Sequence, residues 1–340
     1  YLTAMIISAI VIVAYTTLGG FLAASTSDFI QSIIMSIALV IVLSYGIISV
    51  GGFDGVVAHV GDLKGFLSIT STHDGATNTA TPYSVLSIAS TLAWGLGYFG
   101  MPHILLRFMA IEDTKKLKLS RRVASVWVVI SMSVAVSIGI IGYAMSAEGV
   151  IPNLKDSETI IVQIAHVLST HGIIFAIIAG VILAGILAST MSTSDSQLLA
   201  ASSSVSENLL EGVLNLNLSA GVKIVVARGS VIIISIIAMF LASNPNSSVF
   251  QIVSFAWAGF GATFGPVMLF ALFWKRSNKY GAISGMVAGG IMVFVWKFLV
   301  RPMGGVLGIY ELLPAFIVAS IFIVIVSLLT PAPEKEIVDE

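Results

Sequence analysis

Cysteine is absent from the 340 residues of this sequence, and charge is scarce, because only 10% of the residues carry one. Without cysteine the chain can form neither a disulfide nor a thiolate metal site. Water-soluble domains contain about 25% charged residues, so a deficit of this size is typical of a chain that lies in lipid. The formal net charge of −1 argues against nucleic acid as a partner.

Catalytic signatures are missing as well. The sequence has no Gly-x4-Gly-Lys-Ser/Thr loop to hold phosphates, no zinc motif and no evident pair of nucleophilic serine and histidine. Four of the histidines, in or beside polar loops, follow no metal-ligand spacing. We therefore predict that the chain is not an enzyme, and that an ion gradient is the main energy source left to it.

Apolar residues dominate instead, at 57% of the sequence with a mean hydropathy of +1.04. About 20 such residues in a row cross a bilayer as a helix. Nine runs are long enough, and they cover roughly residues 2–24, 29–50, 83–110, 123–145, 172–200, 222–242, 250–274, 281–300 and 310–329. The predicted fold class is an all-α polytopic membrane protein with about nine transmembrane helices.

Lysine and arginine concentrate in alternate loops between these runs, at residues 107–122, 223–228 and 275–279, and again at Lys335. Cytoplasmic loops carry the excess of positive charge in membrane proteins. We therefore predict a multi-pass protein of the plasma membrane with a cytoplasmic C-terminal tail at residues 331–340. The external loop 51–82 is expected to form an ordered cap or a mobile lid, and residues 157–168 a short surface helix.

The first two runs are separated by Ser25-Thr-Ser-Asp28, which the same topology places in a cytoplasmic turn. An aspartate at such a position can cap the helix that follows it. It can also lie beside the path by which a cation leaves the membrane. Both interpretations of Asp28 stay open on the sequence alone.

A stripe of hydroxyl groups ends the run 172–200. Ser189, Ser192, Thr193 and Ser196 are spaced i, i+3, i+4 and i+7, so they share one face of a helix, with Asp195 beside them. Small oxygen ligands within a membrane suit a hard cation, and Na⁺ is the natural candidate. The alternative is that these hydroxyls bond to their own helix and permit close packing. Asp195 is either an interfacial residue or an ion relay.

The run 83–110 contains material that interrupts a helix, namely Gly95, Gly97, Gly100 and Pro102. Broken membrane helices are where secondary transporters bind their substrates. Trp94, Tyr98 and Pro102 are spaced i, i+4 and i+8 and could line one side of a small pocket. Close helix packing by the glycines is the equally weighted alternative.

Several stretches together resemble the sodium:solute symporter family, and within it the proline symporters. They are residues 19–23, 95–104, 191–193 with Gln197-Leu-Leu, 255–262 and 307–311, which follow in order over nearly the whole chain. The resemblance implies a LeuT-like core of two inverted repeats. Residues 1–330 would form the transporter domain, with the end of the first repeat at about 1–50, the second repeat at about 83–274 and extra C-terminal helices at about 281–330. Four helices are then expected upstream of Tyr1, so the first repeat would be incomplete.

The resemblance also implies roles for individual residues. Ser192 and Thr193 match hydroxyls that bind Na⁺, and Ser189 would add its carbonyl. Trp94, Tyr98 and Pro102 match positions of the substrate pocket. Asp28 matches an aspartate linked to sodium passage, while Asp195 and Ser196 lie where some members place two hydroxyls for a second sodium. Asp195 departs from that pattern, and Met101 replaces the polar residue expected before Pro102.

These observations predict a Na⁺-coupled symporter that carries a small amino acid, most simply L-proline, into the cell by alternating access. The expected partners are the small-molecule substrate and the lipid bilayer, with Na⁺ as the coupling ion and no obligatory protein partner. Pantothenate, a sugar or a carboxylate remains an alternative substrate. An ion channel would need a filter-like run of carbonyl groups, which is not evident. An intramembrane enzyme would need a paired nucleophile and base.

Overall fold

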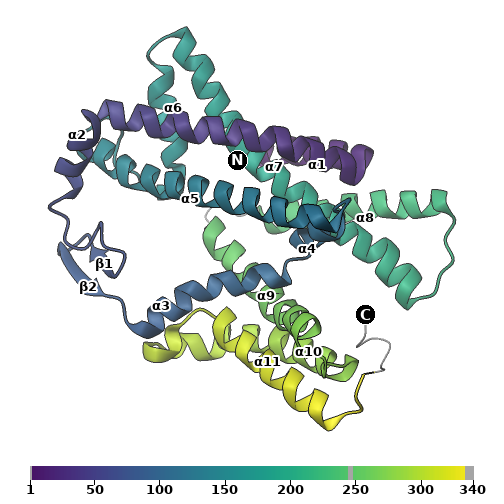
Figure 1. Ribbon diagram of the computed structural model, residues 1–340. Helices are drawn as coiled ribbons and strands as arrows, with labels where there is room; N and C mark the ends of the chain where they lie inside the picture. The colour runs from purple at the N-terminus through teal and green to yellow at the C-terminus, as the bar shows by residue number, and fades with distance from the viewer. Residues whose placement is uncertain (1, 244–247, 334–340) are drawn as a thin grey trace. The chain divides into compact units, whose positions relative to one another are not determined.

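A computed structural model describes residues 2–243 and 248–333 of the chain (Figure 1). Helices form almost all of the described structure, which confirms the predicted all-α class. The one addition is a hairpin of two short strands, β1 (Ser71–Asp74) and β2 (Thr79–Pro82), in the loop predicted at residues 51–82. The chain divides into two compact units, unit 1 (Tyr1–Thr81 and Ile111–Ser243) and unit 2 (Pro82–Ala110 and Asn244–Glu340).

Unit 1 begins with α1 (Leu2–Ser49), which contains both of the first two apolar runs. Its one residue with non-helical angles is Gly20 (φ 61°, ψ −160°). The predicted turn at residues 25–28 is therefore wrong. The hydroxyls of Thr26 and Ser27 donate to the carbonyl oxygens of Leu22 (2.9 Å) and Ala23 (2.8 Å), so these polar residues are satisfied inside the helix. Glycine at position 20 tolerates the positive φ that interrupts the helix.

The remaining elements of unit 1 cover the predicted apolar runs at residues 123–145, 172–200 and 222–242 and the loops between them. They are α2 (Gly52–Val60), η2 (Thr114–Lys116), α5 (Leu117–Ala147), η3 (Ser157–Thr159), α6 (Ile160–Ser169), α7 (Ile173–Ser203), the π-helical η4 (Ser204–Val213) and α8 (Ala220–Leu241). The short helix predicted at residues 157–168 is confirmed by η3 and α6.

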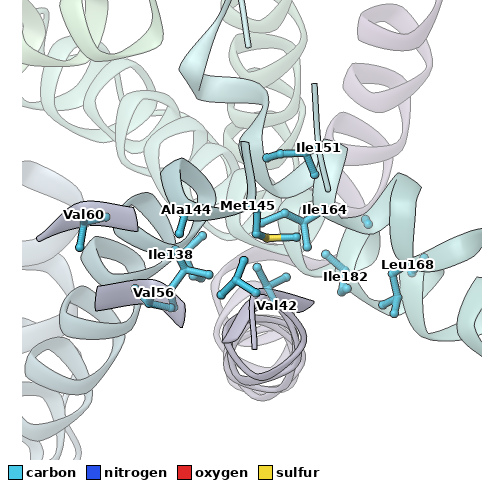
Figure 2. Packing of buried hydrophobic residues seen from close by; sticks show 14 residues of the cluster. Val42, Val56, Val60, Ile138, Ala144, Met145, Ile151, Ile164, Leu168 and Ile182 are labelled. Atoms are coloured by element: carbon cyan, nitrogen blue, oxygen red, sulfur yellow. The ribbon is translucent and has the colours of Figure 1, made fainter. Parts of the chain in front are cut away.

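The core of unit 1 joins five of its helices, α1, α2, α5, α6 and α7. Figure 2 shows Val42 of α1, Met145 of α5, Ile164 of α6 and Ile182 of α7 gathered in one apolar cluster, and all four are buried. In lipid, helices associate through close packing more than through the hydrophobic effect. Interlocked branched side chains of this kind therefore hold α1 and α7, which carry the predicted ion-binding residues, in one packed unit.

Unit 2 contains the interrupted run 83–110 and the C-terminal helices. Its elements are α3 (Val85–Leu92), the 3₁₀-helical η1 (Ala93–Gly100), α4 (Pro102–Met109), α9 (Val249–Phe273), α10 (Lys279–Val295), η5 (Trp296–Val300), η6 (Arg301–Met303), η7 (Gly305–Gly308) and α11 (Leu312–Leu329). Small buried residues such as Ala258, Ala262 and Ala315 form its core with Leu312 and Phe316.

Within the described residues, seven helices are long and apolar enough to cross a membrane, against nine predicted runs. The difference has two sources. The first two runs share α1, and the run 83–110 is divided into α3, η1 and α4. The repeat boundaries stay a prediction. Residues 334–340 of the predicted tail lie outside the described residues.

Candidate ion and substrate sites

The predicted ion-binding residues belong to unit 1 and lie on α7. The carbonyl oxygen of Ser189 accepts a hydrogen bond from Ser192 Oγ (3.1 Å) and another from Thr193 Oγ1 (3.2 Å). Three oxygen atoms of the predicted site are thus brought together within one helical turn. Donation of the hydroxyl protons leaves lone pairs on the side-chain oxygens for a further ligand. Such bonds also occur in helices that only pack, so the Na⁺ assignment stays a prediction.

Asp195 of α7 is buried beside Ser196, a member of the hydroxyl stripe. Its side chain is 0% exposed. The hydroxyl of Tyr15 on α1 donates to Asp195 Oδ2 at 2.9 Å, and Ser196 Oγ lies 3.3 Å from Oδ1. The same Tyr15 hydroxyl lies 3.3 Å from the carbonyl oxygen of Met191. Asp195 therefore joins α7 to α1 within unit 1, and its interpretation as an interfacial residue or an ion relay stays a prediction.

Asp28 lies inside α1, so the prediction that it caps a helix starting after it is wrong. The cause is the absence of the turn described above. Its charge interacts with that of Asp195, so the two carboxylates of the predicted ion path lie near each other in unit 1. Two neighbouring acids attract a cation or share a proton.

Further side-chain oxygen atoms are buried on α1, the helix that packs against α7. Thr16 Oγ1, Thr17 Oγ1 and Gln31 Oε1 have no hydrogen-bond partner among the described residues. Buried polar atoms are normally bonded, so these three are available to a ligand or to water. No group of three or more His, Cys, Asp or Glu side chains that could hold a metal occurs in the described parts of the chain. The donor set of unit 1 is therefore neutral oxygen with Asp28 and Asp195, which fits Na⁺ and not a transition metal.

The predicted helix break is present in unit 2. The 3₁₀ segment η1 ends at Gly100, Met101 is extended (φ −82°, ψ 111°), and Pro102 begins α4. Proline is tolerated at the first position of a helix because its missing N–H would have no partner there. A Cβ on Gly97 would lie 2.0 Å from Trp257 Nε1, and one on Gly100 would lie 2.3 Å from the carbonyl oxygen of Phe260. These glycines let η1 lie directly against α9, whereas a Cβ on Gly95 would meet no atom within 4 Å.

The 3₁₀ winding changes how the predicted substrate residues are displayed. Their spacing was expected to align them on an α-helix, but with about three residues per turn Trp94 and Tyr98 point in different directions. Trp257 of α9 connects them. Its Nε1 donates to the carbonyl oxygen of Trp94 (3.0 Å), and its ring stacks on Trp94 at 5.6 Å and meets Tyr98 edge-on at 4.8 Å. Trp94 and Tyr98 therefore share one aromatic cluster, and among the described residues no ring contact includes Pro102 in it.

Tyr310 completes this aromatic cluster. Its ring stacks on Trp94 at 5.8 Å, its backbone N–H donates to Ser90 Oγ (2.8 Å), and its hydroxyl donates to the carbonyl oxygen of Ser254 (2.6 Å). Burial raises the pKa of the Tyr310 hydroxyl, and the negative charge of Glu311 adds to the effect. The phenol is therefore neutral and remains a hydrogen-bond donor at physiological pH.

Glu311 is fully buried beside Tyr310. Arg301 Nη1 lies 2.6 Å and Lys297 Nζ 3.3 Å from its carboxylate oxygens. A buried carboxylate without such partners would cost several kcal/mol. The two cations thus stabilise the charge at the start of α11 and hold the Tyr310 turn in place.

Comparison with known proteins matches the sequence profile named "Sodium:solute symporter family" to residues 1–289. The chain belongs to the sodium:solute symporter family. This confirms the resemblance carried by the motifs at residues 19–23, 95–104, 191–199 and 255–262.

Curated relatives from this family are similar over nearly the whole chain. The "High-affinity proline transporter PutP" of Bacillus subtilis is 40% identical over 330 residues, which cover 97% of this chain and 66% of that protein. The "Sodium/proline symporter" of Escherichia coli is 38% identical over 338 residues, which cover 98% of this chain and 63% of that protein. The chain therefore spans slightly less than two thirds of the length of these relatives.

A solved structure gives the same fold. It represents the substrate-bound outward-open state of a Na⁺-coupled sialic acid symporter and aligns with a TM-score of 0.73, covering 98% of this chain and 68% of that one. At 17% identity the likeness concerns the fold alone. It confirms the predicted LeuT-like transporter class for this symporter-family chain.

Sequence patterns did not reveal Tyr15, Trp257 or Tyr310 as neighbours of the predicted sites. Tyr15 is 180 residues from Asp195, and Trp257 is 163 residues from Trp94. Trp257 did carry a signal, because it lies in one of the motifs that resemble the family. Tyr15 carried none beyond being a polar aromatic residue in an apolar run.

Proposed function

We propose that the full-length protein is a Na⁺-coupled symporter that carries L-proline into the cell by alternating access. The observation that carries this proposal is the 37–40% identity to curated proline transporters over 97–100% of the chain. The names of these relatives describe what those proteins carry, and the shared motifs at the predicted sites support the transfer. The proposed setting is the plasma membrane, with the C-terminus in the cytoplasm.

In the proposed mechanism, Ser192, Thr193 and the Ser189 carbonyl bind Na⁺. All three are neutral oxygen donors within one turn of α7. Asp28, Asp195 and Ser196 form the path by which the ion leaves. The neighbouring carboxylates of Asp28 and Asp195 favour entry of a cation. The hydrogen bond from Tyr15 to Asp195 joins α1 to α7, so passage of the ion does not require these two helices to separate.

The proposed substrate site is built on Trp94, Tyr98 and Pro102, with Gly95, Gly97 and Gly100 forming the helix break. An aromatic surface and a proline at the first turn of α4 suit a small, compact and largely apolar substrate. At the uncapped start of α4, Pro102 has no N–H and the Ile104 N–H donates to the Met101 carbonyl oxygen (3.1 Å), which leaves the His103 N–H for a substrate carboxylate.

Uptake of labelled proline by the full-length protein in proteoliposomes tests the proposal. An imposed Na⁺ gradient should drive accumulation, and equal K⁺ or H⁺ gradients should not. Failure of Na⁺ to stimulate uptake would contradict the coupling. Accumulation of pantothenate, a sugar or a carboxylate without competition from proline would contradict only the substrate.

A further inference from the structure

An apolar groove of about 620 Å³ runs along α10 and α11, two helices of unit 2 that lie side by side in Figure 1. It is lined from α10 by Tyr280, Ile283, Val287 and Ile291, from α11 by residues that include Phe322, and by Thr330 just after α11. Behind it the helices touch closely, because a Cβ on Gly281 or Gly285 would collide with Ser327 or Ile323. The groove is the furrow left beside this glycine contact.

The hydroxyls of Ser284 and Thr330 in the groove are already satisfied by the protein. Ser284 Oγ donates to the carbonyl oxygen of Gly281 (2.8 Å), and Thr330 Oγ1 donates to that of Val326 (2.6 Å). The lining therefore offers almost nothing to water, while side chains such as Val287 (55%) and Ile291 (60%) are half exposed. Such a surface needs an apolar occupant.

The length of the groove matches one leaflet. From Tyr280 to Met292 it follows twelve residues of α10, which is roughly 18 Å at 1.5 Å per residue. Half of the hydrocarbon core is about 15 Å thick. A single acyl chain, entering at one end, would therefore fill it.

Positive charge is concentrated at one end. Arg276 Nη2 donates to the carbonyl oxygen of Thr330 (2.7 Å), and Lys279 Nζ lies 5.2 Å from the ring centre of Tyr280, so both cations adjoin residues that line the groove. Asn278 fixes the same turn by donating to Thr330 Oγ1 (2.8 Å) and accepting from the backbone N–H of Gly281 (2.9 Å).

The guanidinium of Arg276 can donate further hydrogen bonds. Its Nη1 is buried and has no hydrogen-bond acceptor among the described residues. In that part of the chain neither Arg276 nor Lys279 pairs with a carboxylate. A buried cationic donor without a partner points to an anion that the described residues do not provide.

We propose that this groove binds an anionic phospholipid, with its phosphate at Arg276 and Lys279 and one acyl chain along α10 and α11. The combination of a basic end and an apolar length of one leaflet selects a lipid over a free phosphate, which has no chain, and over a neutral lipid, which leaves the net positive charge unbalanced. The site does not depend on which solute the protein carries.

Native mass spectrometry of the purified full-length protein tests the site. With phosphatidylglycerol or phosphatidylcholine added at equal concentration, the wild-type protein should retain one phosphatidylglycerol preferentially. The double variant Arg276→Ala/Lys279→Ala should lower phosphatidylglycerol affinity at least about tenfold and leave phosphatidylcholine binding nearly unchanged. Glycerol phosphate, which has the charge without the chain, should not compete.

The matched control is Lys118→Ala/Arg121→Ala on α5, which removes one lysine and one arginine at the same spacing from exposed positions that do not line this groove. It should leave phosphatidylglycerol binding unchanged. A groove-filling variant, Ala288→Phe, retains both cations and should reduce the binding of both lipids. Equal loss in the two charge variants, equal retention of the two lipids by the wild type, or competition by glycerol phosphate would each overturn the proposal.

Discussion

The two predicted sites are built in opposite ways. In unit 1, the ion residues lie inside long helices whose polar side chains bond to neighbouring carbonyls, as Thr193 does to Ser189. In unit 2, the substrate residues lie on a broken helix whose glycines admit a neighbouring helix, and aromatic rings do the contacting. The first arrangement keeps oxygen atoms in place for a small ion. The second uses backbone proximity to create a shaped apolar surface, so it has little tolerance for added atoms.

The largest expected effect tests that intolerance. Gly97→Leu should abolish proline uptake, since even the first carbon of the new side chain would lie 2.0 Å from Trp257 Nε1. Gly139→Leu on α5, where an added Cβ meets nothing within 4 Å, lies outside both sites and should retain most of the activity. Uptake would be compared at equal amounts of protein in the membrane. Equal losses in both variants would show that the contact with α9 does not matter.

The corresponding test in unit 1 removes a single oxygen. Thr193→Ala should raise the Na⁺ concentration for half-maximal uptake at least about tenfold, because interactions with a charged group contribute about 1.5–3 kcal/mol. Thr190→Ala is the control, since Thr190 makes the same type of bond to Ile186 at the same distance of 3.2 Å but lies outside the predicted site. If both variants shift the Na⁺ dependence alike, the stripe serves packing.

A smaller effect is expected from Trp257→Phe, which retains an aromatic ring and loses the N–H that donates to Trp94. A hydrogen bond of about 1 kcal/mol corresponds to a rise of roughly fivefold in the KM for proline, with the Na⁺ dependence unchanged. Trp274→Phe at the end of α9, where the indole meets Phe270, should leave KM within about twofold. If Trp257→Phe changed the Na⁺ dependence and left the KM for proline unchanged, Trp257 would not belong to the substrate site.

The smallest effect lies outside both sites, in the β1–β2 hairpin. Thr77 Oγ1 and the Ala76 N–H donate to the Asp74 carboxylate and lower its pKa. The stabilisation is present above the ordinary pKa of 3.8 and is lost as the pH falls through the lowered value. Protection of the hairpin amides in hydrogen exchange should therefore fall slightly at acidic pH, and Asp74→Asn should remove this dependence. Identical pH profiles would contradict it.

The sequence supported the fold class and the two candidate regions well, because apolar length and helix-breaking residues are local properties. The break at Gly95–Pro102 was predictable, since three glycines and a proline cannot continue an α-helix easily. The turn at residues 25–28 was predicted wrongly, because serine and threonine favour turns in general but can also donate to carbonyls one turn back. That choice depends on the surroundings.

Contacts between segments far apart in the chain could not be predicted from the sequence. The bond from Tyr15 to Asp195 and the stack of Trp257 on Trp94 join residues far apart in the chain. Nothing in local spacing selects one partner helix over another. The 3₁₀ winding of η1 could not be predicted either, because the sequence of these residues also fits an α-helical pattern.

That winding has a geometric consequence. A 3₁₀ helix rises about 2.0 Å per residue, against 1.5 Å in an α-helix. The eight residues of η1 therefore extend over about 16 Å, where α-helical winding would give about 12 Å. Rewinding of η1 into an α-helix would therefore shorten the segment between Ser90 and Pro102 by roughly 4 Å without breaking the chain.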